Sequence, residues 1–235
     1  MNSNDLYREI TRGRGYAILK IDDIAAMERF RVQLLQRISG DLALGCIHSL
    51  RTELCLMANK DINSLMIKLL GFPEAADLML LSCADVIRSL CGSKVFLQRR
   101  ANIIFNLPGD EQRHQWPHYE LMSGISPYTF VLWTPLHDID DGSGLFYLDS
   151  DKSLSIMRTE IEKGLVNGPF LFSNVGERTP VRVNYGEVII FNPFIIHGNV
   201  PFSGTKARIA CSIRVQGVDK PLMQRNTDFF KYVEF

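Results

Sequence analysis

Residues 191–199 read FNPFIIHGN, an apolar run that ends in His197 and Gly198. The Asn192-Pro193 pair is a turn signal, so the segment predicts two short strands, 187–191 and 194–197, joined by a turn. A histidine that closes an apolar run is more often a core residue than a metal ligand, so its role depends on the rest of the chain. Gly198 next to it would let the backbone approach a ligand closely.

The second half of the chain shows the same pattern of short strands and turns. Apolar, β-branched and aromatic runs occur at 94–98, 101–106, 127–134, 144–148 and 207–216, with turn signals at 107–110 and 140–143. Many short runs at such spacing are typical of a β sandwich or barrel. Residues 151–165 are predicted to be a helix within this half.

The first half is predicted to be helical. Helices are expected at 22–39, 47–59, 61–70 and 73–92, after a short strand at 16–19. Asp22 and Asp23 are favourable anions at a helix start, and Gly40 is a stop signal. The fold class is therefore mainly β with N-terminal helices (α+β). We expect one domain over 1–235, with helices to about 92, a barrel at about 94–216 and a tail at 217–235.

Composition and charge give no support to several classes of partner. The 235 residues include 26 basic and 26 acidic ones, and this neutral balance favours neither a nucleic-acid nor a membrane partner. The N-terminus shows no signal-peptide pattern, so a cytoplasmic location is the default expectation. The cysteines form no CxxC pair and are expected to be buried thiols in a reducing compartment: Cys46, Cys55, Cys83, Cys91 and Cys211.

His118 is the only histidine with a carboxylate two positions later, in His118-Tyr119-Glu120. Residues i and i+2 of a strand share a face, so this pair could ligate one metal while Tyr119 points away. With a third ligand from a distant strand, it would complete the two-histidine, one-carboxylate triad that suits ferrous iron. A surface-strand histidine beside a solvated glutamate gives the same pattern, so the pair alone is weak.

Arg208 follows His197 by eleven residues and begins a strand that alternates cleanly. Ile209, Cys211, Ile213 and Val215 share one face, and Arg208, Ala210, Ser212 and Arg214 share the other. The second face either meets water or lines the interior of a barrel. In the second case the planar guanidinium of Arg208 would bind a carboxylate through two hydrogen bonds. Alternation does not choose between the two.

Over roughly 94–216 the chain resembles the phytanoyl-CoA dioxygenase family of Fe(II)/2-oxoglutarate-dependent oxygenases. The matching stretches are WPHYE (116–120), FVLWTPL (130–136), YGEV (185–188) and IHGN (196–199), followed by Arg208 at the family's spacing. Glu120 stands where the family has aspartate, and Asn199 replaces a common serine. The family's Pro-Gly-Ser-His motif after the Gly-rich turn is absent.

The resemblance implies a double-stranded β-helix, a jelly-roll or cupin-like barrel, that hydroxylates a small molecule using Fe(II), 2-oxoglutarate and O2. Iron would be held by His118, Glu120 and His197. Cosubstrate or pocket roles are implied for Arg208, Asn199, Trp133 and Asn106, with a structural role as the alternative for the last two.

Alternatives to this function remain. One is a degenerate, non-catalytic barrel that binds a metal or small molecule, and another is a cupin-type metalloenzyme without 2-oxoglutarate. The protein is expected to be a monomer or homodimer. The aromatic-rich tail is predicted to pack over the barrel, with a partner interface as the alternative.

Overall fold

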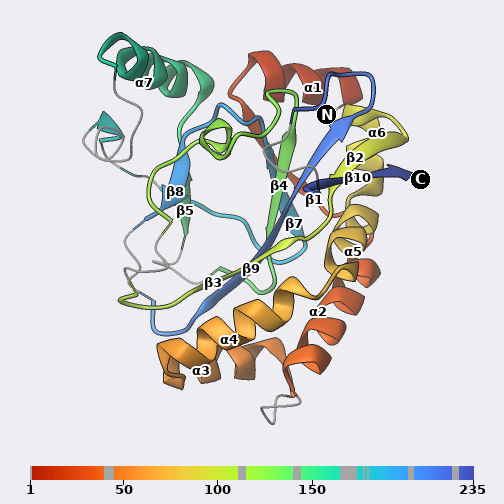
Figure 1. The fold of residues 1–235 in the computed structure, drawn as a ribbon, viewed down its shortest axis with the longest axis vertical. Helices are drawn as coiled ribbons and strands as arrows, with labels where there is room; N and C mark the ends of the chain where they lie inside the picture. The colour runs from red at the N-terminus through yellow and green to blue at the C-terminus, as the bar shows by residue number, and fades with distance from the viewer. Residues whose placement is uncertain are drawn as a thin grey trace.

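The chain folds into two antiparallel sheets flanked by helices (Figure 1). The structure is a computed structural model that describes residues 2–39, 45–110, 115–139, 144–164, 174–176, 178, 180–200, 204–223 and 228–235. The turn expected at 140–143 and the helix stop at Gly40 lie outside these ranges.

The larger sheet carries most of the strands expected from the sequence. Its order is β1 (Tyr16–Lys20), β7 (Glu187–Phe191), β4 (Phe130–Pro135), β9 (Arg208–Gly217), β2 (Lys94–Gln98) and β10 (Phe230–Glu234), with β3 (Asn102–Asn106) also paired to β9. The smaller sheet has the order β6 (Pro180–Val181), β5 (Leu145–Tyr147) and β8 (His197–Asn199). All these pairings are antiparallel, so the expected mixture of helices and antiparallel sheets is confirmed.

The strand expected at 194–197 is misplaced, because β8 begins only at His197. Asn192 extends the turn: its Oδ1 accepts a hydrogen bond from the Phe194 backbone N–H, and its Nδ2 donates to the Ile10 carbonyl. The polar turn therefore outweighs the β propensity of the apolar residues after it.

The helices are α1 (Ser3–Arg12), α2 (Ile24–Ile38), α3 (Ile47–Leu56), α4 (Asn59–Leu70), α5 (Glu74–Ser82), α6 (Ala84–Cys91) and α7 (Ser150–Glu162). The single helix expected at 73–92 is two helices that meet at Cys83. The cause is Asp22, which accepts hydrogen bonds from the backbone N–H groups of Asp85 and Val86 and so caps α6. Asp23 alone caps α2.

Three apolar clusters fix the layers. The largest joins α1 to α6 with the outward face of the large sheet, including Leu132, Ile190 and Ile213. A second lies between the two sheets and contains Val131, Trp133, Tyr147 and Phe191. The third packs α7 against the outward face of the small sheet. Figure 1 shows these layers, with α7 on the side opposite α2 to α5. The space between the sheets is therefore enclosed from both sides.

The described end of the tail, residues 228–235, packs on the body of the protein, as expected. β10 pairs with β2 over five residues, from Phe230 opposite Gln98 to Glu234 opposite Lys94. Within the described ranges, no helix has the length and apolarity needed to cross a bilayer. The cysteine expectation is only partly right, because Cys46 and Cys55 are exposed while Cys83 and Cys211 are buried. None of the cysteines forms a disulfide.

Candidate metal centre

His118, Glu120 and His197 converge between the two sheets. One ligand atom from each lies within 4.8 Å of the other two. The Nε2 atom of His197 is 3.7 Å from Glu120 Oε1, and the two imidazole rings are 4.3 Å apart between centroids. Glu120 and His197 are buried, and His118 is partly exposed. The arrangement brings together the three residues that the sequence singled out as metal ligands.

A single β-bridge places the two histidines side by side. The backbone N–H of each donates to the carbonyl of the other, with N–O distances of 2.9 Å. The strand expected over 118–120 is reduced to this single bridge at His118. Glu120 already begins the 3-10 helix η1 (Glu120–Ser123). Tyr119 between them is still extended, so its side chain points away and its hydroxyl donates to Glu160 of α7.

Both imidazoles direct Nε2 into the site. The Nδ1 atom of His118 lies 2.7 Å from the Trp116 carbonyl, and Nδ1 of His197 lies 3.0 Å from the Ile195 carbonyl. A carbonyl only accepts, so each Nδ1 carries a proton and Nε2 is the ring nitrogen that is left to bind a metal. Such carbonyl partners commonly orient metal-binding histidines.

Burial and charge set the protonation of the triad. Burial, helped by nearby His118, lowers the pKa of His197 to about 3, so this imidazole is neutral at physiological pH. Burial alone would raise the pKa of Glu120, but the Arg214 guanidinium, together with His197 and His118, outweighs it, and the pKa lies below its ordinary value. The site thus holds a carboxylate and a neutral imidazole, the states that bind a divalent cation.

Arg214 is one of the site residues to which sequence reasoning gave no role. Its NH2 group lies 2.7 Å from Oε1 and 2.8 Å from Oε2 of Glu120, and its Nε lies 3.1 Å from Oε2. The strand alternation had placed Arg214 on the same face as Arg208, but no rule of spacing linked it to residue 120. This bidentate pair fixes the carboxylate beside the histidines.

Arg208 lies on the interior face of β9, which excludes the water-facing alternative. It is only 1% exposed, and Ala210 and Ser212 on the same face are also buried. Its NH2 group donates to Asn106 Oδ1 at 2.5 Å and to Asn199 Oδ1 at 2.6 Å. Burial lowers the pKa of Arg208 to about 10, so the guanidinium remains charged at neutral pH. The structure therefore brings Asn106 and Asn199 to the arginine.

Two buried donors face the same interior. Within the described part of the chain, Trp133 Nε1 and the Tyr147 hydroxyl have no hydrogen-bond partner. Trp133 lies 5.6 Å from the Arg208 guanidinium carbon, and the Tyr147 ring stacks on His197 at 5.5 Å. Unsatisfied buried donors are costly and rare, so their clustering here indicates a place for a polar ligand. Tyr147 was missed because only its contacts, and no motif, distinguish it from a core aromatic.

Gly198 is required by close packing. A Cβ atom at this position would lie 2.8 Å from the Gln115 carbonyl oxygen and 3.1 Å from Pro117 N. The segment 115–118 therefore passes directly over β8, which allows the bridge between the two histidines to form.

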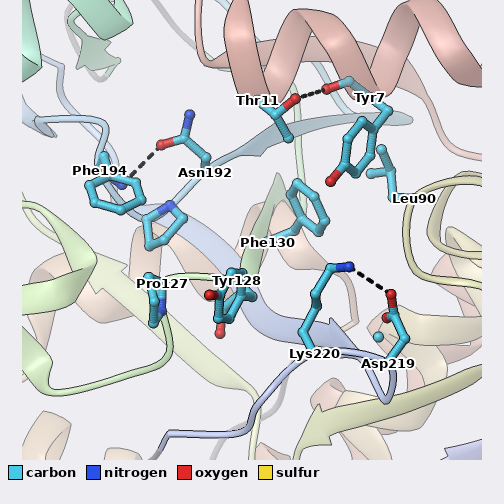
Figure 2. Close-up of a pocket in the computed structure, with 13 residues that line it drawn as sticks. Tyr7, Thr11, Leu90, Pro127, Tyr128, Phe130, Asn192, Phe194, Asp219 and Lys220 are labelled. Carbon is cyan, nitrogen blue, oxygen red and sulfur yellow. Dashed lines mark hydrogen bonds and ion pairs between the residues drawn. The ribbon is translucent and has the colours of Figure 1, made fainter.

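The triad lines a cavity of about 30 Å³ whose other walls include Val131, Leu145 and Phe191. A separate pocket of about 350 Å³ lies beside α1 on the outward side of the large sheet, where Tyr7 faces Phe130 and Lys220 pairs with Asp219 (Figure 2). No residue that lines this second pocket lines the triad cavity. The chemistry implied by the triad therefore belongs to the space between the sheets.

No protein-family model matches the sequence, and a search of curated proteins finds no match. Solved structures share the fold. The non-haem alpha ketoglutarate dependent carbocyclase SnoK from nogalamycin biosynthesis is 14% identical, with a TM-score of 0.56, over 99% of this chain and 96% of that one. HygX from Streptomyces hygroscopicus, with nickel and 2-oxoglutarate bound, is 14% identical with a TM-score of 0.55 over 93% and 88%. The epimerase SnoN, in complex with Fe3+, alpha ketoglutarate and nogalamycin RO, gives 14% and 0.52 over 92% and 83%.

Proposed function

We propose that this protein is a non-haem Fe(II)- and 2-oxoglutarate-dependent oxygenase of the phytanoyl-CoA dioxygenase type, and that it hydroxylates a small molecule. The observation that carries the proposal is the convergence of His118, Glu120 and His197 in one cavity between the sheets, with the Arg208 cluster beside it. The two facing sheets with the site between them support a double-stranded β-helix as the architecture.

The residues present fit the metal. His118, Glu120 and His197 would be its ligands, a set that leaves positions open for a chelating cosubstrate and for oxygen. Glutamate in place of aspartate suits this backbone, because Arg214 holds both carboxylate oxygens and steadies the longer side chain.

The residues also fit 2-oxoglutarate. Arg208 would bind its distal carboxylate, and Trp133 Nε1 and the Tyr147 hydroxyl are unsatisfied donors for the same ligand. Asn199 uses its Oδ1 for Arg208, which leaves its Nδ2 as a further donor. SnoN and HygX, which share the fold, contain 2-oxoglutarate with a metal, and this supports the same assignment here.

When bound, iron, 2-oxoglutarate and O2 supply the oxidising chemistry, so that a substrate C–H bond becomes C–OH while the cosubstrate becomes succinate and CO2. The chain orients and shields these groups. His118 and His197 offer Nε2 because their Nδ1 protons are held by carbonyls, and Arg208 anchors the cosubstrate from inside the barrel. The apolar side chains of Val131, Leu145 and Phe191 line the cavity and would shield the bound groups from water.

Two other functions compete with this proposal. A non-catalytic binding barrel would lack turnover, yet the retention of all three ligand types together with Arg208 argues against it. A cupin-type metalloenzyme without 2-oxoglutarate would have no need for a buried arginine in an asparagine cradle. Each makes a different prediction for metal content and 2-oxoglutarate binding.

The test is anaerobic purification followed by Fe(II) and 2-oxoglutarate titration, with succinate measured after addition of oxygen. We expect one Fe(II) per chain, and loss of metal binding in His118→Ala and His197→Ala but not in the control His48→Ala, which lies on α3. Arg208→Ala should weaken 2-oxoglutarate binding while metal is retained, and exposed Arg88→Ala should not. Metal binding that survives both triad substitutions would refute the site.

A further inference from the structure

An open apolar groove lies between α4 and β3. It has a volume of about 470 Å³, within the range of small-molecule sites. Met66, Ile67 and Leu70 of α4 form one wall, and β3 forms the other. Ile67 is 68% exposed and Leu70 is 56% exposed, so large apolar side chains stand at its rim without a partner among the described residues.

The groove is continuous with the candidate metal centre. Asn102, Ile104 and Gln115 line both the groove and the triad cavity. Asn102 and Ile104 are two residues apart on β3, so they share the face that also carries Asn106, the partner of Arg208. A molecule that lies along α4 and β3 therefore ends beside His118 and Glu120.

The described lining of the groove carries no charged side chain. Within the described part of the chain, no lysine, arginine, aspartate, glutamate or histidine lines it. Its polar groups are Asn102 and Gln115, at the end that meets the metal centre. Asn102 accepts a hydrogen bond from Gln98 through Oδ1, at 3.1 Å, which leaves its Nδ2 to donate. A charged ligand would lose its hydration here without gaining a counter-ion.

We propose that this groove binds the hydrophobic body of a neutral substrate, whose one polar group is held by Asn102 and Gln115 beside the metal. This inference rests on the proposed oxygenase function and adds a substrate class to it. The carbon to be oxidised is then close to the polar end of the substrate, and the apolar remainder lies against Ile67 and Leu70.

The probes are primary alcohols from hexanol to decanol, measured by displacement of the neutral dye Nile red from the full-length protein. Each added methylene should tighten binding about fourfold, because about 0.8 kcal/mol accompanies burial of each CH₂. Decanoate and decylammonium should bind at least about tenfold more weakly than decanol. Equal binding of charged and neutral probes would overturn the proposal.

Variants locate the binding site. Ile67→Asp and Leu70→Asp place a carboxylate at the rim on exposed positions, so the fold should persist while decanol affinity falls about tenfold or more. Leu56→Asp is the matched control, since Leu56 is 75% exposed on α3 but does not line the groove. A loss in the control equal to that at Ile67 would show that the alcohols bind elsewhere.

Orientation is measured by NMR on protein loaded with Mn(II) and 2-oxoglutarate, with Zn(II) as the diamagnetic reference. The protons next to the hydroxyl should broaden more than the terminal methyl, because Asn102 and Gln115 lie at the metal end. The reverse order would contradict the assigned direction.

The two proposals fail separately. The displacement assay needs no metal, so a chain that binds no Fe(II) but still selects neutral alcohols through Ile67 would refute the oxygenase and retain the groove. If the protein binds Fe(II) and 2-oxoglutarate normally but its affinity for alcohols does not depend on the length of the alcohol, only the groove proposal is refuted.

Discussion

Glu120 and Arg214 form a pair in which each residue depends on the other. The Glu120 side chain is 3% exposed and that of Arg214 is 12% exposed, so neither charge is well hydrated. In the metal-free protein, Arg214→Met leaves an unpaired buried carboxylate and should lower the free energy of unfolding by about 3 kcal/mol. Chemical denaturation measures this loss, and adding Glu120→Gln to the variant should restore much of it. A single variant as stable as the parent would contradict the assigned pairing.

The same pair predicts a reversal in pH dependence. In the parent protein Arg214 depresses the pKa of Glu120, so its contribution to stability is present above the unfolded pKa of roughly 4.3 and is lost as pH falls through the folded pKa. In Arg214→Met the strongest opposing charge is lost, so burial, the largest single influence on Glu120, should raise the pKa. That contribution is then present at low pH and lost as pH rises through the raised pKa. Unfolding free energies at pH 5 and pH 7 should show it, with Arg214→Met/Glu120→Gln as the reference.

Residue patterns found part of the site and missed the rest for physical reasons. The His118-x-Glu120 pair was found because strand periodicity predicts that residues i and i+2 share a face, and the spacing from His197 to Arg208 was found through the family resemblance. Arg214 and Tyr147 depend on which strands face one another across the interior, and this is a long-range property. Their contacts with Glu120 and His197 appear only in the folded chain.

At the scale of elements, Gly198 tests the crossing of 115–118 over β8. Gly198→Ala would place a Cβ 2.8 Å from the Gln115 carbonyl oxygen, which must move and pull His118 away from His197. Metal affinity should therefore fall by about tenfold or more, which is about 1.4 kcal/mol. Isothermal titration with Fe(II) or Ni(II) measures it. Gly45→Ala is the control, because a Cβ there meets nothing within 4 Å. An unchanged metal affinity in Gly198→Ala would show that metal binding does not depend on the bridge between His118 and His197.

Element boundaries were the least predictable part of the fold. Local sequence predicted most strands of the large sheet to within a few residues, because their short β-branched and aromatic runs are bounded by turn residues. It could not separate α5 from α6, since the residue that caps α6 is Asp22, more than sixty positions earlier. Nor could it predict α1 or β10 from short, mixed segments that are stabilised by packing.

The tail provides a prediction at the same scale. Phe230 of β10 is 4% exposed in contact with the body of the protein, whereas Tyr232 on the same strand is 54% exposed. Phe230→Ala should cost about 3 kcal/mol of unfolding free energy, and Tyr232→Ala no more than about 0.5 kcal/mol. Urea denaturation compares them. If Phe230→Ala instead changes the oligomeric state and leaves monomer stability intact, the tail serves a partner interface.

At the scale of the whole molecule, the helices and the large sheet share one apolar cluster. Phe30 and Leu34 of α2 belong to the same cluster as Ile190 of β7 and Ile213 of β9. The helical part therefore covers the outward face of the sheet whose inward face carries Arg208 and Arg214. We propose that residues 1–235 are one domain, because neither layer buries its apolar face without the other.

A single domain should unfold in one cooperative step. With Trp116, which is 45% exposed, replaced by phenylalanine, the fluorescence of buried Trp133 reports on the space between the sheets, while far-UV circular dichroism reports largely on the helices. The two urea transitions should coincide. Phe30→Ala, in the helical layer, should shift both midpoints together and lower stability by about 3 kcal/mol. Exposed Val32→Ala on the same helix should shift neither by much. If Phe30→Ala shifts the circular-dichroism midpoint but not the Trp133 fluorescence midpoint, the helical layer and the barrel fold separately. The metal centre would then be stable without the helices.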